Sequence, residues 1–294
     1  MKNKPYRIVL YYLLVGILAV FNFFPYAWVV RFGRFIGRLA FYLSPKEKKK
    51  MLDHLRLAFG NEKAEAELHR IARTVFEGYG MMAVETNLVH KMIPEIDRWI
   101  TIEGREIADE ALKKGNGIVG VVGHFGNWEF LAGCLATKGY PVTVIARKIY
   151  YEKYNQLVLQ VREKMKVRTI YRDQSPREML RTLKNNSILG FVVDQDVDSV
   201  EGIFVNFFGK PAYTPAAPVR FAMASGAPIL PSFLIREGLR HRLVIEKPVE
   251  LEFTGDKEKD LVTNTQKWVA VQEKYIRQYP HLWVWNHKRW KTQP

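Results

Sequence analysis

Cysteine is nearly absent from this chain of 294 residues, which contains Cys134 alone. A single cysteine excludes an intramolecular disulfide and is compatible with a reducing compartment. Internal repeats and low-complexity segments are also missing, and no linker divides the region after about residue 45. We therefore expect one large globular domain with a short appendage.

Acidic residues are few relative to basic ones. The chain has 45 Lys and Arg against 30 Asp and Glu, which gives a formal net charge of +15. Such an excess indicates an anionic partner, for which nucleic acid, anionic lipid and an acidic carrier protein are the candidates. With 48% hydrophobic and 26% charged residues the composition is otherwise that of a globular protein with a sizeable core.

Charged residues are absent from residues 8–30. As one helix this run would be about 34 Å long, enough for a hydrocarbon core of roughly 30 Å, so we expect an N-terminal membrane helix. Pro25 would break that helix and leave a segment at the short end of the spanning range. A buried helix of a soluble protein is the alternative, whereas the missing small-residue cleavage site disfavours a signal peptide.

Basic residues flank this apolar run. Arg31, Arg34 and Arg38 recur at helical spacing among apolar residues, and further basic residues are Lys2, Lys4, Arg7, Lys46, Lys48, Lys49 and Lys50. A basic amphipathic helix beside an apolar anchor suits an anionic membrane surface, and the larger cluster after the run favours the cytoplasmic side. We expect residues 1–45 to form this anchor and residues 46–294 to form the catalytic domain. A merely solvated basic face is the alternative.

The rest of the chain alternates between helical and strand patterns. After a helix over residues 61–92, we expect strands at 99–103, 117–122, 141–146, 167–171, 188–193, 205–209, 228–235 and 241–246, with helices at 105–114, 151–165, 176–183, 214–224 and 261–277. This order predicts an α/β fold with a central mixed, largely parallel sheet flanked by helices.

A tight turn with the sequence G-H-F-G-N-W-E follows the strand predicted at residues 117–122. It places His124 at the carboxyl end of a strand, where open α/β sheets bind ligands. Asn127 can cap the helix that begins after it, and Glu129 lies on the first turn of that helix. The Glu129 carboxylate is therefore expected to fold back towards the imidazole.

An imidazole paired with a carboxylate can accept a proton from a hydroxyl near neutral pH. The turn contains no Ser or Cys nucleophile, so the hydroxyl would belong to a substrate, and direct transfer to an acyl group is one natural interpretation. We predict that His124 and Glu129 are catalytic. The alternative is that the pair forms a structural cap or a simple hydrogen bond.

Other polar residues follow strands that end at the same edge. Arg147 can bind a phosphate or stabilise an oxyanion, or form a salt bridge to a neighbouring carboxylate. Thr214 is expected to cap a helix whose start holds an anionic phosphate. The predicted substrate-binding residues are Arg147, Asp194, Gln195, Asp196, Asn127 and Thr214. A metal held by the D-Q-D segment is disfavoured because no recognised metal motif accompanies it.

The tail from residue 281 to residue 291 combines Trp283, Trp285 and Trp290 with basic residues. Such a segment suits a membrane interface or a phosphate-bearing ligand. It also suits base stacking, so a basic nucleic-acid-binding protein is the non-enzyme alternative. That alternative explains the charge but neither the apolar N-terminus nor the His124 turn.

Several motifs, in order, resemble the bacterial lipid A biosynthesis (late) acyltransferases of the lauroyl/myristoyl type, which are related to glycerolipid acyltransferases. The motifs are H-L-R-L-A-F at 54–59, G-H-F-G-N-W-E at 123–129, A-R-K at 146–148, V-V-D-Q-D at 192–196 and V-N-F-F-G-K-P-A-Y-T-P at 205–215. The resemblance covers nearly the whole chain. One departure is Lys148, where the family often has proline.

The resemblance implies a membrane-associated O-acyltransferase of the bacterial inner membrane, with its catalytic domain on the cytoplasmic side. The implied donor is an acyl carrier protein thioester and the implied acceptor is a hydroxyl of a lipid A precursor, an anionic glycolipid. His124 would be the general base, with no metal or other cofactor, and the D-Q-D segment would shape the acceptor side of the pocket. An acyltransferase that uses acyl-CoA on another glycolipid or a lysophospholipid is the alternative enzyme.

Overall fold

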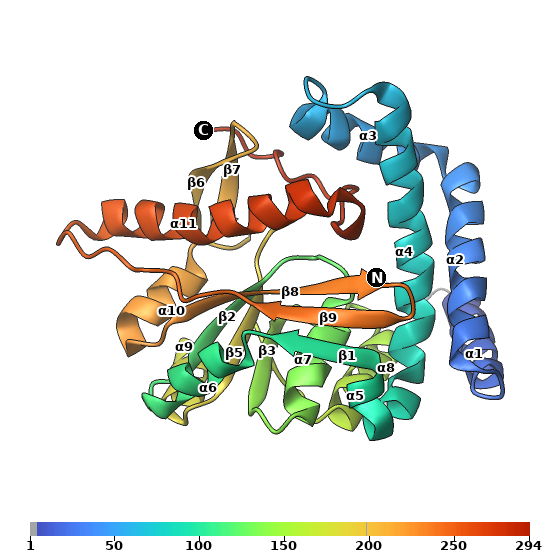
Figure 1. Ribbon diagram of the computed structural model, residues 1–294, viewed down its shortest axis with the longest axis horizontal. Coiled ribbons are helices and arrows are strands. Elements are labelled where there is room, and N and C mark those ends of the chain that lie inside the picture. Colours follow the sequence, from blue (N-terminus) through green and yellow to red (C-terminus); the bar gives the residue numbers. More distant parts are fainter. Residues whose placement is uncertain (1–4, 198) are drawn as a thin grey trace.

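The computed structural model describes residues 5–197 and 199–294, apart from the side chains at positions 5, 6, 7 and 10. In this part of the chain a sheet of seven strands has the order β1-β9-β8-β2-β5-β3-β4 (Figure 1). Its strands are β1 (Ile100–Glu103), β2 (Ile118–Val122), β3 (Val142–Ala146), β4 (Arg168–Tyr171), β5 (Ile188–Val192), β8 (Ile229–Glu237) and β9 (Arg240–Ile245). β8 and β9 pair antiparallel and the other neighbours pair parallel. The predicted mixed, largely parallel sheet is therefore confirmed.

Helices cover both faces of the sheet, as Figure 1 shows. The helices of the described residues are α1 (Pro5–Phe21), α2 (Tyr26–Leu43), α3 (Pro45–Phe59), α4 (Glu65–Met92), α5 (Ile96–Trp99), α6 (Arg105–Lys113), α7 (Trp128–Thr137), α8 (Glu152–Lys164), α9 (Pro176–Lys184), α10 (Ala217–Ser225) and α11 (Lys257–Gln278), with 3₁₀ turns η1 (Ile93–Glu95) and η2 (Pro280–Leu282). Of these, α1 and α2 lie at the side of the molecule, against α4 (Figure 1). Most predicted helices and strands are present within a few residues of their expected bounds.

Side-chain alternation along β2 assigns the two faces of the sheet. Ile118 packs with the buried residues of α6 and α7, whereas Val119 and Val121 pack with those of α9, α10 and α11. Successive side chains of a strand point to opposite faces, and here both faces are buried, which is why the sequence of β2 is almost continuously apolar.

The prediction that Thr214 caps a helix is wrong. Thr214 lies in β7 (Lys210–Pro215), which forms a hairpin with β6 (Gly202–Phe207), and α10 begins after Ala216, which makes no side-chain cap. The hairpin forms because Phe208 and Gly209 both have positive φ, at +53° and +74°, as a two-residue type I′ turn requires. The Thr214 side chain is therefore fixed within the hairpin and does not stand at a helix start.

The expected N-terminal membrane helix is not found. The apolar run is divided into α1 and α2 at residues 22–25, because proline cannot continue the hydrogen-bond ladder of α1. Among the described residues no helix has both the length and the apolarity needed to cross a bilayer. The predicted basic residues Lys2 and Lys4 lie outside the described residues.

Helices α2 and α4 pack in close contact. A methyl group on Gly37 would lie 2.1 Å from the Phe76 carbonyl oxygen, and one on Gly80 would lie 2.0 Å from the Gly33 carbonyl oxygen. The three glycines therefore bring the two backbones together.

An ion cluster crosses the same contact between α2 and α4. The buried Glu77 carboxylate accepts hydrogen bonds from Arg34 and Arg38, at 2.6 and 2.7 Å. Two of the three arginines that the sequence pattern assigned to a membrane surface are thus held by a carboxylate of α4.

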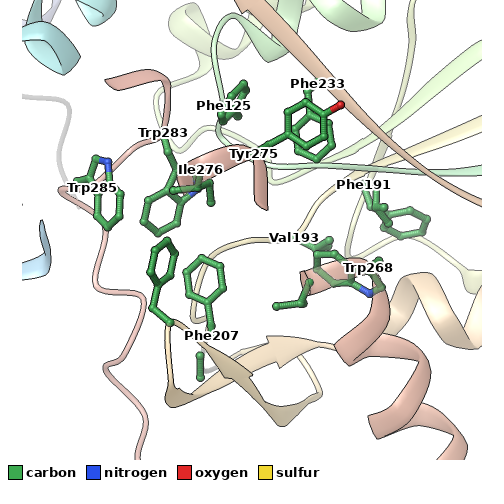
Figure 2. Close-up of a cluster of buried hydrophobic side chains, with 14 of the residues drawn as sticks. Phe125, Phe191, Val193, Phe207, Phe233, Trp268, Tyr275, Ile276, Trp283 and Trp285 are labelled. Atoms are coloured by element: carbon green, nitrogen blue, oxygen red, sulfur yellow. The ribbon is translucent and has the colours of Figure 1, made fainter. Parts of the chain in front are cut away.

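The tryptophan-rich tail is largely part of the core. Trp283 is 2% exposed and Trp285 is fully buried. Figure 2 shows them with Phe207 of the hairpin and Ile276 of α11, beside Phe125 from the turn after β2. Their indoles are therefore not available for the interfacial or base-stacking contacts that the sequence pattern suggested.

Candidate active site

His124 lies immediately beyond the carboxyl end of β2, in a turn that pairs with the C-terminal segment of the chain. The His124 carbonyl accepts a hydrogen bond of 3.1 Å from the Val284 backbone N–H, and the Leu282 carbonyl accepts one of 2.8 Å from Gly126. Phe125 and Trp283 form an antiparallel bridge between these hydrogen bonds. The turn is thus fixed by the tail, while the His124 side chain remains 22% exposed and so accessible.

Asp194 is the carboxylate partner of the imidazole. Its Oδ1 lies 2.6 Å from His124 Nδ1, and its Oδ2 accepts hydrogen bonds from the His124 backbone N–H and the Trp283 indole, each also 2.6 Å. An Nδ1–H that donates to Asp194 leaves Nε2 unprotonated, which is the tautomer that a general base requires. The side-chain nitrogen of Gln195 lies 3.2 Å from that Nε2.

The environment of Asp194 favours its ionised form. Burial opposes ionisation, but the electrostatic interaction with His124 and the hydrogen bonds from His124 and Trp283 outweigh it and hold the pKa of Asp194 below its ordinary value. A carboxylate in this position fixes the orientation of the imidazole and stabilises the imidazolium that forms when Nε2 accepts a proton.

The expected hydrogen bond between Glu129 and His124 is not formed. Both carboxylate oxygens of Glu129 accept hydrogen bonds from Arg162 of α8, at 2.7 and 2.8 Å. Because α7 starts at Trp128, the first helical turn directs Glu129 towards α8, while the imidazole faces the loop after β5. Glu129 therefore links two helices, and the acid that contacts the imidazole comes from the loop after a neighbouring strand.

Asn127 is confirmed as a helix cap, because its side-chain oxygen accepts a hydrogen bond of 3.1 Å from the Phe130 backbone N–H. Its amide nitrogen donates a hydrogen bond of 2.9 Å to Glu85 of α4, which is fully buried. Glu85 also bonds to side chains of α2, β8 and β9, namely Tyr26, Arg236 and His241. Asn127, which was predicted to bind substrate, therefore connects the His124 turn through Glu85 to α2, α4, β8 and β9.

Asp196 and Thr214 were predicted to bind substrate and instead hold the C-terminal segment. Asp196 is buried and accepts hydrogen bonds from the backbone N–H groups of Lys291 and Thr292, at 3.1 and 2.7 Å. The Thr214 hydroxyl is fully buried and accepts a hydrogen bond from Arg289. Neither side chain is therefore directed at the imidazole.

Arg147 and Gln195 differ in the contacts that they make. Arg147 is exposed just after β3, and among the described residues no hydrogen bond or ion pair occupies its guanidinium. Of the predicted substrate-binding residues, only Asp194 and Gln195 contact the His124 ring within the described part of the chain. β2, β5 and β3 are parallel neighbours, so their carboxyl ends meet at one edge as predicted, and the residues after β5 make the contacts to the ring.

A cavity of about 220 Å³ opens beside the His124 turn, between the turn and α4. Its apolar walls include Met81, Met82 and Trp128, and the charged residues that line it are Arg34, Glu77 and Arg236. The Trp128 ring meets the His124 ring edge-on, with 4.8 Å between the ring centroids, so it connects the cavity to the imidazole. An apolar cavity with a few charged groups can bind an amphipathic ligand next to the base.

Sequence reasoning assigned Asp194 to substrate and missed it as the partner of His124. The prediction that His124 and Asp194 each follow the end of a strand was correct. The sequence does not show that these strands, β2 and β5, are neighbours, and it is this pairing that brings Asp194 to His124. Arg162 and Trp283 were missed for the same reason, since their contacts join segments far apart in the chain. No local pattern marks Arg162, and the pattern of the tail marked Trp283 for a different role.

Comparisons with known proteins agree on one family. A family model described as bacterial lipid A biosynthesis acyltransferase matches residues 2–292. The chain is 27% identical over 291 residues to the lipid A biosynthesis lauroyltransferase of Escherichia coli, an alignment that covers 95% of this chain and 90% of that protein. It is 25% identical over 288 residues to the palmitoleoyltransferase of the same organism, with the same shares of 95% and 90%. A phosphatidylinositol mannoside acyltransferase of Mycobacterium tuberculosis is 29% identical over 152 residues, 50% of this chain and 47% of that protein.

Proposed function

Because the chain belongs to the bacterial lipid A biosynthesis acyltransferase family, and is thus an acyltransferase, we propose that it moves a fatty acyl chain from an acyl carrier protein thioester to a hydroxyl of a lipid A precursor. The observation that carries the proposed mechanism is the short contact between Asp194 and His124 Nδ1, which leaves Nε2 as the base.

The proposed reaction is a direct transfer. His124 Nε2 accepts the proton of the acceptor hydroxyl as its oxygen attacks the thioester carbonyl, an ester C–O bond forms and the C–S bond breaks. The proton then passes from the imidazolium to the departing thiolate, so the enzyme returns to its starting state. Asp194 stabilises the imidazolium, and no acyl-enzyme is required.

We assign Glu129 a positioning role in this scheme. Its ion pair with Arg162 joins the first turn of α7 to α8, and α7 carries Trp128 against the imidazole. Removal of the carboxylate should therefore act through the placement of α7 and not through the proton transfer itself.

Three further groups are assigned to substrate. Gln195, whose side-chain nitrogen is 3.2 Å from Nε2, lies where it can contact the reacting groups. The exposed Arg147 is available to an anionic substrate. The cavity beside the turn, whose arginines Arg34 and Arg236 are paired with Glu77 and Glu85, suits an amphipathic acceptor.

Association with the inner membrane is proposed from the surface of α1 and α2. Trp28, Phe32, Phe35 and Leu39 recur at helical spacing along α2 and are 42 to 64% exposed. Exposed large apolar side chains on α1 include Val9, Tyr12, Leu13 and Val20. An apolar stripe beside arginines suits a helix that lies in the interface of an anionic membrane, on the cytoplasmic side where the carrier protein is found. The net charge of +15 would attract an acidic carrier.

The experiment that tests the function is a transfer assay with purified, detergent-solubilised protein, a labelled acyl carrier protein thioester and a lipid A precursor. We expect wild-type protein to transfer the label and His124→Ala to lose roughly 10²- to 10⁴-fold in turnover while it stays folded. Wild-type rates in a folded His124→Ala variant would contradict the mechanism.

A second acceptor is favoured by the similarity to phosphatidylinositol mannoside acyltransferases. The same assay, with acyl-CoA as donor and a phosphorylated glycolipid or lysophospholipid as acceptor, distinguishes this acceptor from the lipid A precursor. Faster transfer to that acceptor than to the lipid A precursor would favour the alternative.

A further inference from the structure

A second, apolar cavity of about 50 Å³ lies between the sheet and α7. Its walls come mainly from β2, β3, β5, β8 and α7, and apart from Ser232 its lining residues are apolar, aromatic or glycine. Trp128 lines both this cavity and the one beside the His124 turn, and its ring also contacts the imidazole.

Two glycines line this space from the central strands. Gly120 of β2 and Gly190 of β5 are directly paired in the parallel register. The nearest heavy atom to a methyl group built on Gly120 is 3.5 Å away, at Ile188, and on Gly190 it is also 3.5 Å away, at Val144. Alanine would therefore fit at either position without a clash, in contrast to Gly37, where the nearest atom is 2.1 Å away.

Glycine weakens the interior of a strand, and there it often marks a place that a ligand approaches closely. Since alanine would fit at both positions, packing within the protein does not account for the missing side chains. Alanine at either position would instead fill part of the cavity that the two glycines line.

We propose that this cavity receives the methyl end of the donor acyl chain, and that Gly120 and Gly190 set the chain length that the enzyme accepts. The inference rests on the proposed function for the identity of the ligand. The thioester carbonyl lies at His124, the chain passes Trp128, and its end reaches the glycine pair. A volume of about 50 Å³ holds only a few methylene groups, so one added methyl group is a large fraction of the available room.

The test compares Gly120→Ala, Gly190→Ala and a control, Gly16→Ala, which changes a glycine on α1 with no atom within 4 Å of the new methyl. Binding of saturated fatty acids that differ by two carbons is measured by displacement of a fluorescent fatty acid, and transfer is measured with the matching acyl thioesters. We expect each cavity variant to lose roughly tenfold in affinity for the longest chain that wild-type protein binds well, and to keep its affinity for chains two carbons shorter. Gly16→Ala should keep the wild-type preference.

Val144→Ala should shift the preference in the opposite direction, towards longer chains, because it enlarges the same cavity. Thermal unfolding shows that each variant is folded. Unchanged length preference in folded Gly120→Ala and Gly190→Ala proteins would overturn the proposal.

The His124→Ala variant separates this proposal from the proposed function. It should bind fatty acids with the wild-type length preference while it transfers no acyl chain. A shift in binding preference in the glycine variants supports the cavity assignment whatever the transfer assay shows, whereas transfer that survives His124→Ala contradicts the mechanism alone.

Discussion

At the scale of single residues, the site depends on which carboxylate contacts His124. Asp194 is buried, accepts three hydrogen bonds and points at Nδ1, whereas Glu129 is occupied by Arg162. The two acids therefore differ in what their removal should change. Asp194 should affect the chemical step, and Glu129 should affect the placement of α7.

Asp194→Asn should lower kcat by roughly 10²- to 10⁴-fold with little change in KM, because the amide no longer fixes the tautomer of His124 or stabilises its charge. Steady-state kinetics measures this. Asp196→Asn is the matched control, since Asp196 is also a buried acid but contacts the tail and not the imidazole. Equal losses of kcat in the two variants would contradict the assignment.

Glu129 and Arg162 should be coupled energetically. Removal of either charge leaves its partner largely buried and unpaired, and a double-mutant cycle of Glu129→Gln and Arg162→Gln should give an interaction energy of about 1 to 3 kcal/mol in unfolding. Chemical denaturation measures all four proteins. Additive effects would show that the ion pair does not hold α7 to α8.

At the scale of elements, the contact between α2 and α4 depends on glycine. α2 carries both the exposed apolar stripe and Tyr26, which reaches Glu85 behind the His124 turn. The same helix therefore has one face available to a membrane and another that supports the site. The predicted division of the chain at residue 45 stays a prediction.

Gly37→Ala should destabilise the protein by about 1 to 3 kcal/mol, because its methyl would lie 2.1 Å from the Phe76 carbonyl oxygen and force the two helices apart. Denaturant unfolding measures the change. Gly16→Ala, with open space around the new methyl, should leave stability unchanged or raise it slightly. Equal stability of the two variants would contradict the packing argument.

At the scale of the whole molecule, two buried carboxylates link stability to pH. Burial alone would raise the pKa of Glu85, but the charges of His241 and Arg236 and the hydrogen bonds to Glu85 outweigh it, so its pKa is lowered, as is that of Asp194. A carboxyl group with a lowered pKa in the folded state stabilises the protein above its unfolded pKa, which is about 4, and loses that contribution as the pH falls through the folded value.

We therefore expect the free energy of unfolding to fall as the pH is lowered below about 4, and Glu85→Gln to weaken that dependence. Urea unfolding at a series of pH values measures it. An unchanged acid dependence in Glu85→Gln would show that this cluster does not contribute.

Membrane contact is a property of the whole surface formed by α1 and α2. Wild-type protein should sediment with vesicles that contain anionic lipid, and added salt should weaken the binding because the arginines contribute. Phe35→Ser should reduce binding severalfold, since it removes an apolar side chain from the stripe. Phe253→Ser is the control, because Phe253 is 65% exposed but lies outside the stripe. Equal losses in both variants would contradict the proposed surface.

The sequence by itself determined most of the order of strands and helices, apart from α3 and β7, together with the position of His124 at a strand end and the cap formed by Asn127. These features depend on local patterns, namely side-chain periodicity, glycine turns and capping residues, which act over a few neighbouring positions.

Only the tertiary structure decided which acid contacts the imidazole and where the tail tryptophans lie. Asp194 meets His124 because β5 pairs with β2, and Glu129 is drawn to α8 by Arg162. Such contacts join residues tens of positions apart, and the free energy that selects them comes from packing and charge pairing in the assembled fold, which no local pattern encodes.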